Sequence, residues 1–92
     1  MDNAIREIID GIKSGLYFDS HFVINQLIRN HSDAYLRYAQ EFKADVSDIT
    51  LVMHGQIGLK IGRLTDKVEK VGDSLSENIH TNIGECACWR KL

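Results

Sequence analysis

Residues 56–71, which read QIGLKIGRLTDKVEKV, decide the fold class that we expect for this chain. In the first part of this stretch, apolar residues recur every three or four positions, which is typical of the buried face of an α-helix. Residues 67–71 alternate between charged and apolar side chains, which is typical of a strand. Because Gly72-Asp73 is a turn signal, we predict a helix over 56–67 and a β-hairpin whose second strand covers 75–80. The apolar helix positions are Ile57, Ile61, Leu64 and Val68.

Three helices are expected before this stretch. Isoleucines at helical spacing predict the first over residues 3–14, and Gly15 is a suitable stop. The second helix is expected to begin near Asp19, with either Asp19 or Ser20 as the residue that caps its first turn. Ser32 opens a third helix after the break at Asn30-His31. The core is expected to include Ile5, Ile8, Ile9, Phe22, Leu27, Ile28, Tyr35, Phe42, Ile57, Ile61, Leu64 and Trp89.

The sequence of two segments is compatible with either a helix or a strand. Residues 49–55 are apolar and β-branched, so they fit a short strand or the first turns of a longer helix capped by Ser47. Residues 82–92 fit a strand, or a helix begun by Asn82 with Glu85. With either choice, the sequence predicts one helix-rich α+β domain over residues 1–92. Three N-terminal helices, a glycine-containing helix and a C-terminal hairpin region resemble the order of elements in a winged helix-turn-helix, with the hairpin as the wing.

The composition is that of a globular protein. Of the 92 residues, 43% are hydrophobic and 26% are charged, which excludes a disordered tail and a collagen-like or coiled-coil chain. The net charge of −2 argues against a surface that binds nucleic acid all over, although residues 51–92 carry six basic and five acidic side chains. Apolar runs are too short to span a membrane, and we expect a cytoplasmic protein.

A basic stripe is the most specific functional hint. Lys60, Arg63, Lys67 and Lys70 follow one another at intervals of three, four and three residues, with Gln56 one turn earlier. On one helix these side chains would share a face that is offset from the apolar one, a geometry that suits contacts to phosphates. Gln56 could then read an adenine edge in the major groove. The sequence therefore predicts a small regulator that binds duplex DNA, whereas the duller interpretation is a solvated helix face.

The alternative function is a protein-interaction module, either a homodimer or an inhibitor of a partner protein. Gly55, Gly58 and Gly62 share one helix face and together cost about 2–3 kcal/mol of helix propensity. Close approach of another backbone would offset that cost. A small core also gains from additional buried area, which an interface would supply.

Metal binding and catalysis are not expected. His54, His80, Cys86 and Cys88 are residue types that bind zinc, but Cys-x-Cys is not the usual spacing, and packing explains the two thiols better. Asp19-Ser20-His21 has the residue types of a hydrolase triad, yet neighbours on a helix point in different directions. We therefore expect a non-enzymatic protein without a cofactor.

Three segments look like parts of small uncharacterised bacterial or prophage proteins. They are residues 18–24 (FDSHFVI), 76–80 (SENIH) and 86–91 (CACWRK), and the resemblance would cover most of the chain. It implies a bacterial or phage origin and favours a small regulator or an interaction protein.

Overall fold

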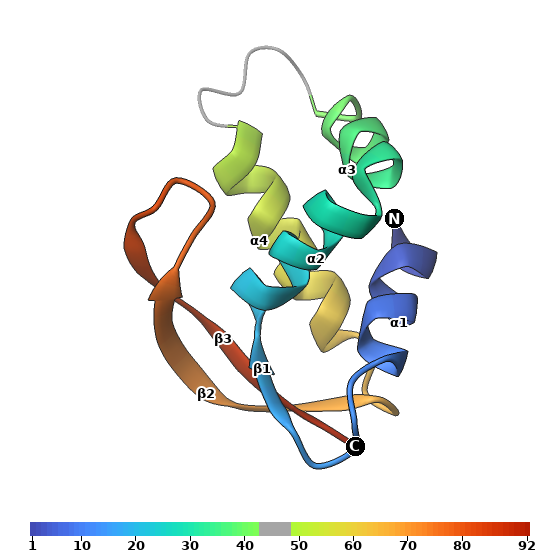
Figure 1. Ribbon diagram of the computed structural model, residues 1–92, viewed down its shortest axis with the longest axis vertical. Coiled ribbons are helices and arrows are strands. Elements are labelled where there is room, and N and C mark those ends of the chain that lie inside the picture. Colours follow the sequence, from blue (N-terminus) through green and yellow to red (C-terminus); the bar gives the residue numbers. More distant parts are fainter. Residues whose placement is uncertain (43–48) are drawn as a thin grey trace.

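Helices and strands follow one another in the order α1–β1–α2–α3–α4–β2–β3 in the computed structural model, which describes residues 1–42 and 49–92. The expected α+β class is confirmed, and the helices lie on one side of a small antiparallel sheet (Figure 1). The elements are α1 (Asp2–Asp10), β1 (Tyr17–Asp19), α2 (Ser20–Asn30), α3 (Ser32–Ala39), α4 (Ile49–Gly62), β2 (Val68–Glu77) and β3 (Ile83–Lys91).

Local signals placed the beginnings of the N-terminal helices well. The Asp19 carboxylate accepts a 2.8 Å hydrogen bond from the backbone N–H of Phe22, so Asp19 and not Ser20 caps α2. Helix α3 begins at Ser32, also as predicted. Helix α1 ends at Asp10, four residues before the expected end. Gly15, with a φ of +88°, lies in the turn that leads into β1 and does not end the helix.

The open segment over residues 49–55 is helical and forms the first half of α4. The proposed cap at Ser47 lies outside the described residues. Helix α4 ends at Gly62, so the prediction that it continues to Lys67 is wrong. The chain turns immediately afterwards, since the N–H of Leu64 donates to the carbonyl of Ile61 at 3.0 Å and closes a tight final turn.

The sheet has the order β1-β3-β2, and both pairings are antiparallel. The prediction of a turn at Gly72-Asp73 is wrong, because strand β2 continues through these two residues. Gly72 instead adopts a φ of +148° at a β-bulge, where the register shifts after Lys70. The hairpin turns ten residues after β2 begins, where the side-chain oxygen of Asn78 accepts hydrogen bonds from the N–H groups of His80 and Asn82. The open segment at the C-terminus is strand β3.

The core lies between the helices and the inner face of the sheet. Strand β1 was not predicted, but it pairs Phe18 with Trp89 and brings both rings into the core. Phe22 was expected there, but its side chain is 41% exposed, so that prediction is wrong. The buried apolar residues are Ala4, Ile5, Ile9, Phe18, Val23, Ile24, Leu27, Met53, Ile57, Ile61, Val68 and Trp89, with Ile8, Ile28, Tyr35, Phe42 and Leu64 half-buried around them.

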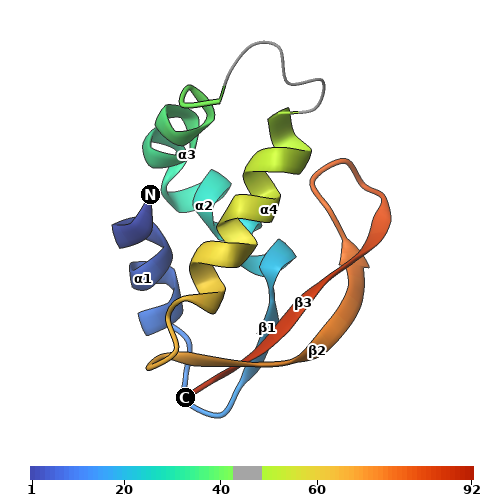
Figure 2. The same ribbon diagram turned by 180° about the vertical axis from the view of Figure 1, so that it is seen from behind.

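Helix α4 lies behind α2 in Figure 1, and Figure 2 shows it from the other side, where no other helix covers it. The β2–β3 hairpin curves up beside the helices, and its tip lies near the first turns of α4, where Thr50 and His80 are hydrogen-bonded (Figures 1 and 2). None of the described helices is long and apolar enough to cross a membrane.

Candidate functional site

Helix α4 carries large apolar side chains on two opposite sides. Met53, Ile57 and Ile61 point inward and are almost completely buried. On the other side, Leu51 is 72% exposed and Leu59 is 56% exposed. A helix that is apolar all round is normally buried on every side, so the exposed side of α4 is unusual for a surface helix. We call this surface the outer face of α4, and it consists of Leu51, Val52, Gly55, Gln56 and Leu59.

The three glycines of α4 have different surroundings. A Cβ at Gly62 would lie 3.2 Å from the Trp89 ring, so close internal packing explains this glycine. A Cβ at Gly58 would make an ordinary 3.9 Å contact with the Ser20 hydroxyl. A Cβ at Gly55 would meet no described atom within 4 Å. The predicted close approach was that of another backbone, whereas the close neighbour at Gly62 is the Trp89 side chain. A glycine in a helix interior costs about 1 kcal/mol relative to alanine, and at Gly55 no described contact offsets this cost.

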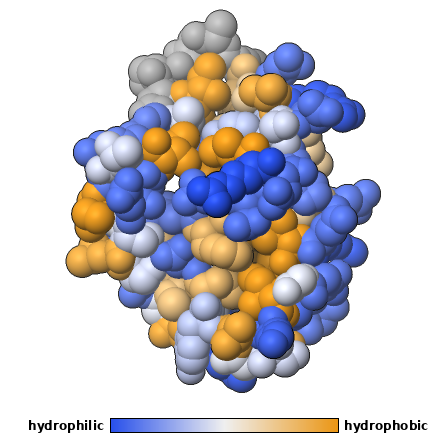
Figure 3. Space-filling view, viewed as in Figure 1, coloured by the Kyte–Doolittle hydropathy of each residue, from blue (hydrophilic) through white to orange (hydrophobic). Residues whose placement is uncertain are grey.

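A groove of about 470 Å³ separates the hairpin tip from α2 and α4, and it is visible as a hollow in Figure 3. Three imidazoles line it, and each is hydrogen-bonded to a hydroxyl: His21 to Ser76 at 2.6 Å, His54 to Tyr35 at 2.8 Å and His80 to Thr50 at 3.2 Å. Leu51 and Gly55 also line this groove, so it is continuous with the outer face of α4.

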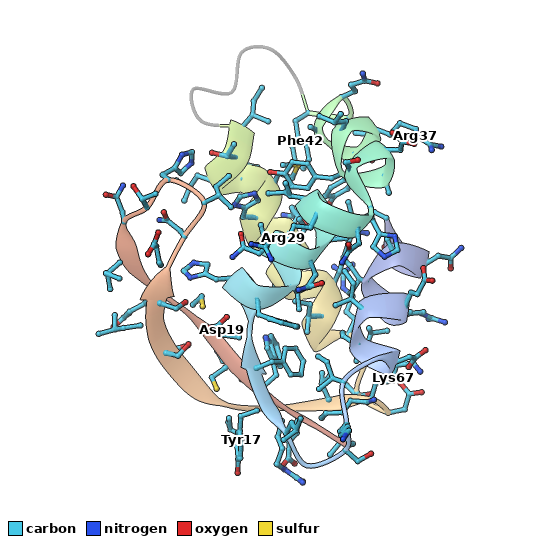
Figure 4. All side chains as sticks on the ribbon, in the orientation of Figure 1. Tyr17, Asp19, Arg29, Arg37, Phe42 and Lys67 are labelled. Atoms are coloured by element: carbon cyan, nitrogen blue, oxygen red, sulfur yellow. The ribbon has the colours of Figure 1, made fainter. Side chains whose placement is uncertain are left out.

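Asp19 anchors the hairpin to the start of α2 near this groove (Figure 4). Ser74 donates a 3.2 Å hydrogen bond to its carboxylate. Burial raises the pKa of Asp19, but hydrogen bonds from Phe22, Ser76 and Ser74 outweigh that effect and hold the pKa below its usual value. Ser76 therefore lies between the Asp19 carboxylate, whose pKa it helps to lower, and the His21 ring, to which it is hydrogen-bonded. In a hydrolase triad the imidazole occupies that middle place, so this cluster lacks the triad arrangement.

The basic stripe is divided among several elements. Lys60 lies on α4, Arg63 follows its end, Lys67 lies in the next turn and Lys70 is in β2. The expectation of one helical stripe is therefore wrong, because α4 ends at Gly62. Whether the five predicted residues contact DNA stays a prediction.

Carboxylates of the same chain lie against three of these cations. Lys60 donates to Asp2 at 2.8 Å, and this hydrogen bond raises the pKa of Lys60 and lowers that of Asp2. Lys67 donates to Asp10 at 2.6 Å, and Lys70 lies 3.7 Å from Asp73. Exposed pairs of this kind contribute little to stability. The pairs with Asp2 and Asp10, at the two ends of α1, partly neutralise the positive charge of the basic stripe. Arg63 is exposed.

The weak metal candidates are only partly gathered. His54, His80 and Cys86 all line the groove, while Cys88 lies two residues further along β3. Across residues 1–42 and 49–92, no group of three or more His, Cys, Asp or Glu residues is placed to hold a metal ion. His21 lines the same groove, but sequence reasoning considered it only as part of a triad and did not group it with these residues.

A second apolar surface lies on the opposite side of the molecule, where the end of α1, β1 and the start of α2 meet. Leu16, Tyr17 and Phe22 are exposed around a groove of about 620 Å³. Figure 3 shows apolar patches among hydrophilic side chains on this side of the molecule. This surface is divided among a turn, a three-residue strand and the first turn of α2, whereas the outer face of α4 lies on one regular helix.

The outer face of α4 could have been found from the sequence. Leu51, Val52 and Leu59 lie off the spacing of the buried residues, so residues 49–62 are apolar around the whole helix once they are recognised as helical.

Comparison with known proteins finds no family model, no curated protein and no solved structure that matches this chain.

Proposed function

We propose that the protein is a non-enzymatic interaction module that binds another protein through the outer face of α4. The observation that supports this most is the exposure of Leu51 and Leu59 on a helix whose inward side is fully buried. Apolar side chains on a rigid helix are the usual centre of a protein interface, because their burial releases water without a large loss of conformational entropy.

Charge favours a protein partner as well. The outer face of α4 carries no ionisable side chain, and Arg63 lies just past its C-terminal end. Interface centres are depleted in charged residues in the same way. A helix that contacts phosphates would instead present several cations to solvent.

Photo-crosslinking tests this proposal directly. When Leu59 is replaced by the photoreactive residue benzoylphenylalanine and the cells that express the protein are irradiated, we expect one defined product in which the chain is crosslinked to its partner protein. Arg29, exposed on α2 on the opposite side of the molecule, provides the matched control position, and no such product is expected there (Figure 4). If position 59 yields no more adduct than position 29, the outer face of α4 is not an interface.

A winged-helix DNA-binding protein is the second candidate. The strand order β1-β3-β2 and the placement of the β2–β3 hairpin directly after α4 support it, because they suit a wing beside a recognition helix. The residues that would contact DNA are Gln56, Lys60, Arg63, Lys67 and Lys70. Among them, Gln56 lies on the outer face of α4, and Arg63 is exposed.

Titration with duplex DNA at several salt concentrations separates the two candidates. DNA binding through the four cations predicts an affinity that falls steeply with salt, with a log–log slope of about −3 to −4. The double variant Asp2→Asn, Asp10→Asn should then bind DNA more tightly, because the two substitutions remove the carboxylates that pair with Lys60 and Lys67. Absence of binding at about 50 mM salt removes this candidate, since phosphate contacts are strongest there.

A further inference from the structure

We propose that the partner of the outer face of α4 is a second copy of this chain, with the two α4 helices crossing at Gly55. This inference rests on the proposed function and names its partner. It starts from the arrangement of three residues: Leu51, Gly55 and Leu59 follow one another at intervals of four and form one straight ridge along the exposed side of the helix.

The ridge is symmetric about its centre. It has a large side chain at each end and a notch at Gly55. In a twofold dimer, residue i of one copy contacts residue j of the other and the reverse, so a patch must fit itself. Two such ridges fit when the helices cross at their notches, because the leucines of each copy then pack beside the glycine of the other. Ridges of residues four apart favour this kind of crossing.

Packing among the described residues does not require a glycine at the centre. A Cβ there would meet no described atom within 4 Å, whereas the Cβ position of Gly62 is 3.2 Å from Trp89. An exposed helix interior favours residues with a side chain. A glycine at the midpoint of an exposed apolar ridge therefore fits an approach from outside the molecule, where the missing side chain lets a second helix come close.

Charge selects the orientation of the two helices. Arg63 is exposed and lies just past the C-terminal end of α4, eight positions beyond Gly55. This spacing corresponds to about 12 Å along a helix axis. In an antiparallel pair the two Arg63 side chains lie at opposite ends of the interface. A parallel pair would bring these like charges to the same end, and its helix dipoles would also repel each other.

Sedimentation velocity over a range of micromolar concentrations tests the dimer. The unmodified chain should sediment increasingly as a dimer as its concentration rises. Leu59→Lys should weaken the association by about 100-fold or more, because it buries an unpaired charge at the interface. Leu36→Lys is the matched control, since Leu36 is 59% exposed on α3, away from the ridge, and should leave the association unchanged. Circular dichroism confirms that both variants are folded.

A disulfide at the crossing point tests its position. In a chain that carries Cys86→Ser and Cys88→Ser, Gly55→Cys should form a disulfide-linked dimer under mild oxidation, and Arg29→Cys should not. A dimer that is linked equally well through either position would overturn the proposed crossing.

The two proposals can fail separately. An unmodified chain that stays monomeric at every concentration overturns the homodimer. If position 59 still gives a photo-adduct in that case, and its mass differs from twice that of the chain, the interaction module stands with a different partner. If no adduct forms either, both proposals fail.

Discussion

Replacing Trp89 by alanine is expected to lower the free energy of unfolding by about 3–5 kcal/mol. Small domains are stable by only about 5–15 kcal/mol, so this loss is a large fraction of the total stability. Trp89 lies on the central strand β3, and its ring packs between the end of α4 at Gly62 and the start of α2. The indole N–H donates a 3.1 Å hydrogen bond to the hydroxyl of Ser20, which is itself buried. Alanine removes both the packing and the donor.

Urea unfolding followed by circular dichroism measures this effect. Trp89→Phe is the control, because it keeps an aromatic ring against Gly62 and loses the hydrogen bond together with part of the ring volume. We expect the phenylalanine variant to lose about 1–3 kcal/mol. A loss below about 1 kcal/mol for the alanine variant would show that Trp89 does not join the sheet to the helices.

The second large effect compares the two sides of α4. Ile57→Ala should cost about 2–5 kcal/mol, because Ile57 is fully buried and the core cannot fill the cavity. Leu59→Ala should cost less than about 0.5 kcal/mol in the monomer, since Leu59 is largely exposed. Both positions lie well inside the same helix, and both changes raise the helix propensity slightly. The difference between the two variants therefore reports burial.

Dilute protein is required for this comparison, because an interface at Leu59 would add stability at high concentration. Equal losses for the two variants would contradict the assignment of Ile57 to the inward side. An increase with protein concentration in the cost of Leu59→Ala, with no such change for Ile57→Ala, would independently support an interface on the outer face of α4.

Local patterns predicted the helices and missed the details of the sheet. The cap at Asp19 and the start of α3 at Ser32 depend on neighbouring residues, which the sequence displays directly. Strand β1 has three residues and is stabilised by pairing with β3, about seventy positions later in the chain. No local pattern marks so short a strand. Gly72 has the composition of a turn, but the pairing of β2 with β3 continues through it as a bulge.

The candidate site was predicted in the wrong form for a related reason. The basic residues are spaced as on one helix, but that helix ends at Gly62. Lys60 pairs with Asp2 and Lys67 with Asp10, and these partners are separated by 58 and 57 positions in the chain. Ion pairs between such distant segments depend on how α1 packs against the rest of the molecule. The apolar outer face of α4 was visible in the composition of residues 49–62, once that segment was known to be a helix.

By itself, the sequence determined the fold class, the starting points of α2 and α3 and the inward side of α4, because capping and helical periodicity act between residues a few positions apart. Only the tertiary structure decided where α4 ends, how β2 and β3 pair, which glycine packs against Trp89 and which cations meet a carboxylate. Those features arise from contacts between segments far apart in the chain, whose free energy depends on the packing of the whole domain.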